Sequence, residues 1–281
     1  MSLLQAYEYH VSNVERLLGT EYAYNTLRRY SSSLNSLKRF LNGNDIKLSS
    51  LEYKFVSDYY FYLLTAEKLQ PNSAFKNIKA LNKVIHVCML NKWLTTNPFR
   101  DFRCRYKNPI RVYLTENEIN TIYQYKFPTK RLTQVRDAFI FQVYTGLSYV
   151  DILNLTQDNI EIGVDGRQWI VIYRKKTGTR SAIPILPIAK EVLTKYDYTI
   201  PVCSNQKLNE YLKEIGKLCS IAKKLTTHVG RHTFATTVCL SHGIPIETVS
   251  KLLGHTDIKT TQIYAKVTDT KIADDMRLLM G

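Results

Sequence analysis

Three short segments of this 281-residue chain carry residue types that could bind or attack a phosphate. In the first, His228 and Arg231 stand three residues apart where a helix is expected to begin, so both side chains would lie on one helix face. An imidazole and a guanidinium that converge in this way can hold the non-bridging oxygens of a phosphate. A capping histidine beside a surface arginine would give the same pattern, so this pair alone leaves both interpretations open.

The second segment, L-L-G-H-T at 252–256, places His255 nine residues before Tyr264. A tyrosine can act as a covalent nucleophile when its surroundings stabilise the phenolate. The chain has 20 tyrosines, however, and a tyrosine packed on a helix face is the simpler interpretation of Tyr264 taken alone.

The third segment is R-K-K-T-G-T-R at 174–180. Within it, Lys176 could donate a proton to a leaving oxygen, although a solvated basic turn would have the same composition. A metal site is not expected. His232 follows His228 at the spacing of a zinc pair, but the glutamate of that motif is absent and position 229 is Val.

The first hundred residues are expected to be helical. Apolar residues recur at three- and four-residue steps over 24–41, 56–64 and 73–90. Gly43 and Asn44 are expected to end the first of these helices, and the pair Pro71-Asn72 to form a turn between the other two.

The second half is predicted to be mixed. A capping box of Thr115 and Glu118 begins a helix over 114–124, and the apolar run 136–144 predicts a buried helix. The β-rich runs 169–173 and 181–186 flank a polar turn and predict a hairpin. Helical periodicity returns from Pro187, so the expected fold is mainly α with a small antiparallel sheet.

Composition and charge favour two domains that bind a polyanion. The chain carries 39 Lys and Arg against 24 Asp and Glu, and a division at residue 110 leaves +8 before it and +7 after it. Two basic globular halves predict a nucleic acid held between them, whereas solvated helix faces are the alternative. The segment 97–110, with two prolines and four basic residues, is the expected linker, and it would cross the duplex in a C-shaped clamp.

Other classes of protein are excluded. The longest uncharged apolar-rich stretch, 138–150, is far shorter than the roughly 20 residues of a bilayer span. No secretory leader is evident, so a cytoplasmic location without membrane contact is expected. Five scattered cysteines with no C-x-x-C pair indicate reduced thiols.

Together the three segments resemble the tyrosine recombinase, or phage integrase, family. The motifs in order are T-G-L-x-x-x-D at 145–151, K-T-G at 176–178, H-x-x-R at 228–231, L-G-H at 253–255, and Tyr264. Five motifs in register over 112–266 are far more specific than any one of them. The segment R-Y-x-x-x-L-x-x-L-x-x-F at 29–40 is similar in pattern to the family's core-binding domain. The resemblance therefore implies a helical, SAM-like core-binding domain over 1–107 and a mixed α+β catalytic domain over 108–281.

The resemblance implies a site-specific DNA recombinase or integrase of a mobile element that needs no metal, ATP or other cofactor. Tyr264 would attack the scissile phosphate and form a 3′-phosphotyrosyl link with a free 5′-hydroxyl. Arg231, His228 and His255 would hold the non-bridging oxygens, and Lys176 would protonate the departing oxygen. Asp151 would support the geometry of the site.

One position departs from the family pattern. Ser148 stands where the family usually has a first catalytic arginine, and the pattern resembles a sub-branch of conjugative-transposon integrases. Since a hydroxyl cannot make a bidentate charge-assisted contact, another cation is expected to replace the arginine. Arg174 is the candidate, because it lies two residues from Lys176 on an expected strand and would share its face. A sheet-edge Arg174 in solvent is the alternative, and Arg180 is the weaker substitute.

The expected partner is double-stranded DNA. We expect the protein to form a homotetramer on DNA and to be a monomer without DNA. The residues expected to contact DNA outside the active site are Lys76, Lys79, Lys83, Arg103, Arg105, Lys107 and Arg180. The tail 267–280 could pack in a neighbouring protomer or on its own domain. Within these 281 residues we do not expect the arm-binding domain that many relatives carry. The competing interpretations are a non-catalytic DNA-binding protein with a decayed recombinase fold, favoured by Ser148 alone, and an RNA-binding structural protein.

Overall fold

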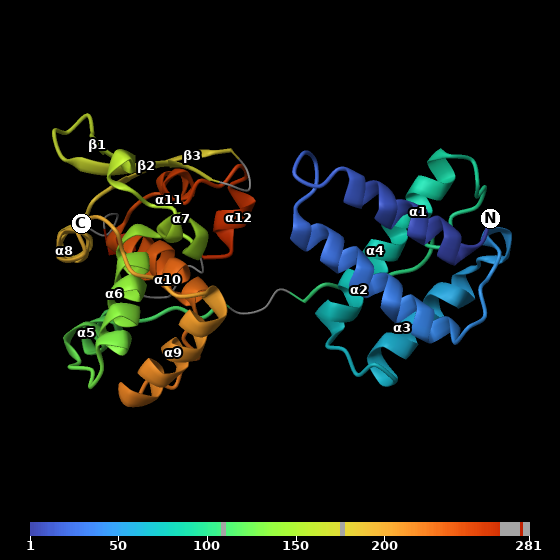
Figure 1. Cartoon of the computed structure of the whole chain (residues 1–281), viewed down its shortest axis with the longest axis horizontal. Helices are drawn as coiled ribbons and strands as arrows, with labels where there is room; N and C mark the ends of the chain where they lie inside the picture. Colours follow the sequence, from blue (N-terminus) through green and yellow to red (C-terminus); the bar gives the residue numbers. More distant parts are fainter. Residues whose placement is uncertain (108–110, 175–177, 265–275, 278–281) are drawn as a thin grey trace. The chain divides into compact units, whose positions relative to one another are not determined.

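The computed structural model describes residues 1–107, 111–174, 178–264 and 276–277 (Figure 1). The chain divides into two compact units, Met1–Pro109 and Ile110–Gly281. Among the described residues, no helix has both the length and the apolar character that a membrane span requires.

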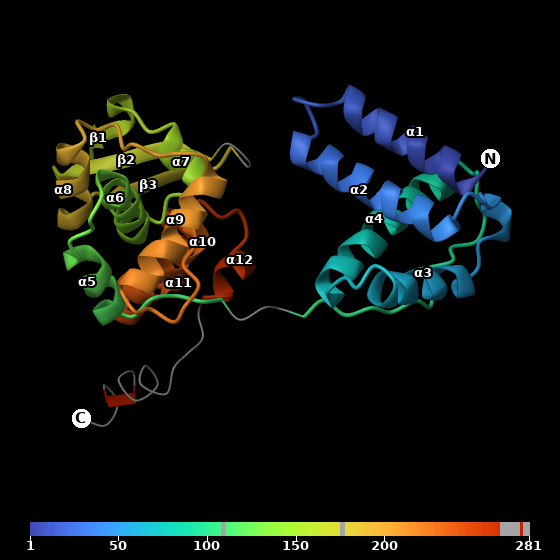
Figure 2. The ribbon, with the colours of Figure 1, turned by 60° about the horizontal axis from the view of Figure 1, so that its bottom comes forward.

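The first unit is entirely helical. Its elements are α1 (Leu3–Arg16), α2 (Tyr24–Leu41), the short 3₁₀ turn η1 (Leu48–Ser50), α3 (Tyr53–Thr65) and α4 (Pro71–Leu90). Helices α1 and α2 pack side by side, and α4 packs against α1, α2 and α3 (Figure 2). The three amphipathic stretches of the sequence are thus confirmed as helices, and α1 is an additional one.

Local chemistry sets the ends of these helices. The Ser2 hydroxyl accepts from the Gln5 amide and the Gln5 side chain accepts from the Ser2 amide, which is a capping box at the start of α1. Helix α2 ends where Asn42 and Gly43 take left-handed conformations, with φ of 45° and 83°.

Two expectations for this unit are wrong. Pro71 is the first residue of α4 rather than part of a turn, because the missing N–H of a proline costs nothing at that position. The segment 97–110, expected as the interdomain linker, also belongs largely to the first unit. Phe99 is buried, and the Asn72 side chain holds the Lys107 backbone with bonds of 2.7 and 2.9 Å. Residues 108–110 lie outside the described part.

The second unit combines helices with one sheet. Its elements are α5 (Glu116–Gln124), α6 (Lys130–Thr145), α7 (Tyr149–Leu153), η2 (Gln157–Asn159), β1 (Ile160–Ile162), β2 (Gln168–Tyr173), β3 (Arg180–Pro184), α8 (Pro187–Lys195), α9 (Asn205–Leu218), α10 (Thr227–Thr233), the π-helical turn η3 (Phe234–Cys239), η4 (Leu240–His242), α11 (Ile246–Leu252) and α12 (Lys259–Gln262).

Helix α6 is the centre of this unit. It packs against α5, α8, α9, α10 and η3, and its second half is buried on nearly every side (Figure 1). The sequence predicted the buried part, 136–144. The helix is longer because Thr129 caps its amino end and Gly146, with φ of 66°, ends it.

The sheet is antiparallel in the order β1-β2-β3. The predicted hairpin is confirmed, with Tyr173 opposite Arg180 and Trp169 opposite Pro184. The sequence missed β1, which is only three residues long and pairs Ile160 with Ile170. So short an edge strand shows no alternation of its own. The fold class, mainly helical with a small antiparallel sheet, is confirmed.

Candidate active site

Helix α10 presents the H-x-x-R motif. The Thr226 hydroxyl accepts from the Val229 amide and caps the helix, which places His228 in the first turn and Arg231 one turn later. His228 is exposed, whereas Arg231 reaches inward and is half-buried. Desolvation and the charges of Arg231 and Arg111 lower the pKa of His228.

Arg231 joins two motifs that are far apart in the sequence. Its Nη1 donates to the Gly146 carbonyl at 2.6 Å, and its Nη2 donates to the Leu253 carbonyl at 2.7 Å. Gly146 can take its left-handed turn against Phe234 only without a side chain, since a Cβ there would lie 2.4 Å from the Phe234 ring. The T-G-L and L-G-H motifs therefore fix the same guanidinium. Burial, helped by the charge of Arg174, lowers the pKa of Arg231 to about 10, so it stays charged.

His255 is neutral and its tautomer is defined by its partners. Arg231 Nη2 lies 3.1 Å from His255 Nε2, and a guanidinium can only donate. Nε2 is therefore the acceptor, and Nδ1–H donates to the Thr261 hydroxyl at 2.8 Å. Desolvation, with the charges of Arg231 and Arg174, lowers the pKa of His255 to about 4, in agreement with this state.

Ser148, Asp151 and Arg174 form one hydrogen-bonded unit. Ser148 caps α7, and both its amide and its hydroxyl donate to Asp151, at 2.9 and 2.6 Å. Arg174 Nη1 donates to the same carboxylate oxygen, and both side chains of this ion pair are more than nine-tenths buried. Ser148 is thus linked through Asp151 to Arg174.

Arg174 differs from its expected position on a strand. It lies one residue beyond β2, where its amide donates to the Thr179 carbonyl and its carbonyl accepts from Gly178. Its side chain turns into the domain, and Nη2 bonds to the Ser181 hydroxyl at 3.2 Å and the Leu252 carbonyl at 3.4 Å. The alternative of a solvated sheet-edge arginine is therefore wrong.

A glycine makes room for this buried guanidinium. Gly254 has φ of 63°, and a Cβ on it would lie 2.9 Å from Arg174 Cγ and Nε. The glycine of L-G-H therefore serves two purposes, a left-handed turn and close contact with Arg174.

Tyr264 is buried within this cluster, with 7% of its surface exposed. Burial raises the pKa of its hydroxyl, and the charges of Arg231 and Arg111, with a hydrogen bond to Arg231, work in the opposite direction. Its ring stacks on His255 at 6.4 Å between centroids. The phenol is therefore neutral and adjacent to the Arg231 guanidinium.

Two residues of this cluster were missed as parts of the site. His232 packs on the Tyr264 ring with centroids 5.0 Å apart, and Arg111 is close enough to influence Tyr264, His228 and His232 by its charge. A signal existed for His232, which directly follows the H-x-x-R motif. Arg111 gave none, because it reaches the site by tertiary contact. Its segment is anchored by the bond of 3.0 Å from the Leu114 amide to the Thr233 hydroxyl.

The other predicted residues lie elsewhere. Lys176 and most of the tail 267–280 fall outside the described residues. The lysines of α4, which are Lys76, Lys79 and Lys83, are all exposed, as are Arg103, Arg105, Lys107 and Arg180. Their charged ends can therefore meet a ligand from solvent.

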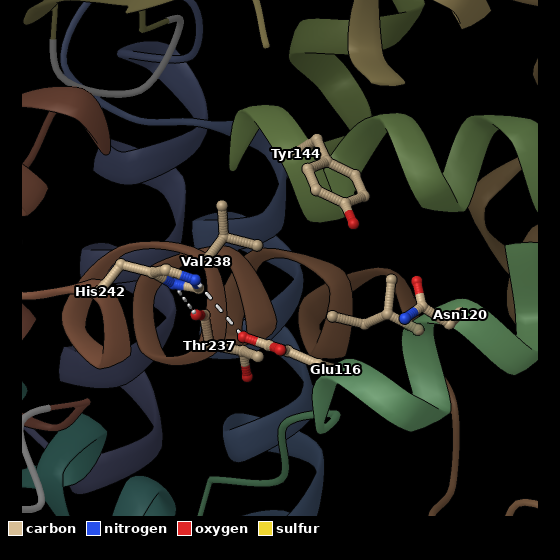
Figure 3. A pocket seen from close by; sticks show the side chains of 7 residues that line it. Glu116, Asn120, Tyr144, Thr237, Val238 and His242 are labelled. Atoms are coloured by element: carbon tan, nitrogen blue, oxygen red, sulfur yellow. Dashed lines mark hydrogen bonds and ion pairs between the residues drawn. The ribbon is translucent and has the colours of Figure 1, made fainter. Parts of the chain in front are cut away.

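A hollow of about 280 Å³ lies between α5, α6 and η3 in the same unit. Figure 3 shows His242 bonded to the Thr237 carbonyl and facing Glu116, at 3.1 and 3.4 Å. Ile119 and Val238 supply its apolar lining. It contains none of the residues predicted to do chemistry.

Comparisons with known proteins identify the family of the chain. The profile of the phage integrase family matches residues 112–271, and that of the phage integrase SAM-like domain matches residues 2–108. The chain is 25% identical to the tyrosine recombinase XerC of Pediococcus pentosaceus, over 99% of this chain and 97% of that protein.

Solved structures share the fold. A lambda integrase dimer bound to a COC′ core site superposes with a TM-score of 0.77 at 21% identity, covering 96% of this chain and 98% of that one. A lambda integrase tetramer bound to a Holliday junction gives 0.75 at 21% identity, covering 96% and 80%.

Proposed function

We propose that this chain, which belongs to the phage integrase family and is a tyrosine-type site-specific DNA recombinase, uses Tyr264 as its nucleophile to integrate or excise a mobile element. The observation that carries this proposal is the buried phenol of Tyr264 beside Arg231, which two separate motifs hold in place. Five motifs in register also oppose the alternative of a decayed, non-catalytic fold.

The reaction exchanges one phosphodiester for another. The Tyr264 oxygen forms a bond to the scissile phosphorus while the bond from phosphorus to the 5′-oxygen breaks. The products are a 3′-phosphotyrosyl link and a 5′-hydroxyl, whose proton Lys176 supplies. Because the link conserves the energy of the bond, attack by a 5′-hydroxyl reverses the step without metal, ATP or another cofactor.

Arg231 and the two histidines would stabilise the transition state. The negative charge on the phosphorus oxygens grows during attack, and donors fixed beforehand lower its energy most. Arg231 keeps two of its donors on carbonyls, so its guanidinium can turn only its remaining N–H groups to the phosphate. When the phosphate displaces His255 from Arg231, Nε2 of His255 takes up a proton from solvent, and the imidazolium then donates to the phosphate beside His228.

The proposal assigns the missing arginine's place to Arg174. Ser148 cannot supply a charge, but Asp151 beside it holds the Arg174 guanidinium at the same end of α7. The charge of Arg174 reaches both Arg231 and His255, which supports its presence at the site. Asp151 is then a positioning residue.

The remaining parts of the proposal concern DNA and assembly. The exposed α4 lysines and the basic residues 103–107 would contact phosphates on one side of a duplex, in a clamp with the catalytic domain. The lambda integrase tetramer on a Holliday junction supports a homotetramer on DNA. Without DNA, the protein would be a monomer. The enzyme would work in the cytoplasm with its DNA, and its tail, 267–280, would pack either in trans or on its own domain.

A suicide duplex tests the function. The duplex carries a nick close to the scissile phosphate, so that the released fragment diffuses away and the covalent adduct accumulates. Wild-type protein should form an adduct that denaturing gels resolve, and Tyr264→Phe should form none while still binding the duplex. Tyr144→Phe is the matched control, since Tyr144 is half-buried in the same domain beside the hollow near Glu116. Binding without any wild-type adduct would refute the proposal.

A further inference from the structure

His232 is a half-buried imidazole with an unused nitrogen next to Tyr264. Its ring lies 5.0 Å from the Tyr264 ring and 6.2 Å from the His228 ring, between centroids. Its Nδ1 is shielded from solvent and makes no hydrogen bond among the described residues. A buried polar atom without a partner is unfavourable, so its presence beside a nucleophile requires an explanation.

The other groups around Tyr264 are already engaged. Both ring nitrogens of His255 are bonded, to Arg231 and to Thr261. The Asp151 carboxylate is held by Arg174 and Ser148. His228 is exposed, so water competes for its nitrogens. Among the described residues, His232 therefore has the best available acceptor next to the phenol.

We propose that His232 is the proton acceptor of Tyr264 during strand cleavage. The inference rests on the function proposed above. When the phosphate engages Arg231, the Tyr264 hydroxyl loses that partner and turns to Nδ1 of His232. As the bond from the tyrosine oxygen to phosphorus forms, the phenol proton passes to His232. The 5′-oxygen takes its proton from Lys176, and in the reverse step His232 returns its proton to the tyrosine.

The surroundings of His232 keep it ready for this role. Desolvation and the charges of Arg111, His228 and Arg231 lower the pKa of His232 to about 4, so it is an uncharged acceptor at pH 7. A bound phosphate opposes the charges of Arg111 and Arg231. The pKa of His232 therefore rises towards its ordinary value when DNA is bound, which makes the imidazole a better base at the moment of attack.

Replacing His232 by phenylalanine tests the proposal, because it retains a flat ring and removes both nitrogens. On the suicide duplex at saturating DNA, His232→Phe should cleave roughly 100-fold more slowly with unchanged DNA affinity. Its rate should no longer level off as the pH rises, because hydroxide would have to take the proton. His242→Phe, on the exposed histidine of the hollow, is the control and should behave as wild type.

Chemical rescue separates a base from a packing group. In His232→Ala, added imidazole should restore cleavage at least tenfold, whereas pyrrole, which has the same shape and no basic nitrogen, should not. Equal rescue by both compounds, or His232→Phe within threefold of wild type, would overturn the proposal. If His232→Phe unfolds at a lower urea concentration, the comparison of imidazole with pyrrole still decides. A wild-type protein that forms no adduct would instead refute the proposed function.

Discussion

The buried ion pair of Arg174 and Asp151 separates a structural role from a chemical one. Replacing Arg174 by methionine preserves most of the volume and leaves Asp151 as a buried charge with only the two Ser148 donors. Removing one partner of a buried pair destabilises a protein by about 3–5 kcal/mol. Because Ser148 still satisfies the carboxylate, we expect Arg174→Met to lose about 3 kcal/mol of unfolding free energy.

The second substitution removes the stranded charge. Asp151→Asn in the Arg174→Met background leaves an amide whose oxygen can still accept from the Ser148 backbone. Neutral replacements of a buried pair are often no less stable than the pair itself, so the double variant should recover to within about 1 kcal/mol of wild type. Urea unfolding followed by tryptophan fluorescence measures both shifts. Arg167→Met, an exposed arginine just before β2, is the control and should change stability little.

Cleavage should not recover with stability. If the Arg174 guanidinium acts on the phosphate, the folded double variant should still lose about two orders of magnitude in single-turnover cleavage at saturating DNA. Adding Ser148→Arg to Arg174→Met restores a cation beside Asp151 and should regain part of the rate. Near-normal cleavage by the stable double variant would refute the assignment of Arg174, and unchanged stability of Arg174→Met would refute the buried pair itself.

Charge on the protein leads to three further predictions. Changing the α4 lysines together to glutamine should reduce the slope of log affinity against log salt by up to about 0.9 for each phosphate that the variant no longer neutralises. The control, Lys54→Gln on α3, should leave the slope unchanged. An unchanged slope in the α4 variant would exclude α4 from the interface. The isolated unit 110–281 should bind its site far more weakly than the whole chain, in a mobility-shift assay, because a clamp needs both halves; equal affinity would contradict the clamp. Lowering the pH from 7 to 5 should reduce the free energy of unfolding by up to about 2 kcal/mol for each of His232 and His255. The pKa of each imidazole is about 4 in the folded protein and about 6.5 in the unfolded chain, so only the unfolded chain binds these protons at pH 5. Urea midpoints at the two pH values measure this effect, and the phenylalanine variants should flatten it.

Elements with local chemical signals could be predicted from the sequence. Thr115 and Glu118 form the predicted capping box at 3.3 Å and 2.7 Å, and the strands of the hairpin begin and end within two residues of their predicted ends. The pair Pro71-Asn72 predicts a turn, but Pro71 begins α4, because proline favours both a turn and the first position of a helix. The three residues of β1 carry too little pattern to distinguish a strand from a loop.

The site was predictable in its residues and not in its contacts. Motif spacing indicated Arg231, His255 and Tyr264, but the two carbonyls that hold Arg231 come from residues 85 and 22 positions away. The acceptor state of His255 likewise depends on which donor faces it. Such facts arise only when distant turns meet, so no local pattern carries them.

Ser148 shows why the spacing of a motif and the charge it delivers are separate properties. Asp151, three residues later, accepts a hydrogen bond from the Ser148 amide. Its carboxylate determines where a cation is favourable, whichever residue of the chain supplies that cation. A guanidinium at position 148 would have to be close to Asp151, and Arg174, which lies just beyond the end of β2, bonds to the same carboxylate. Gly254 leaves the room that this longer approach needs. A cation can therefore reach this motif from elsewhere in the chain, and the acidic residue of the motif marks where that cation lies.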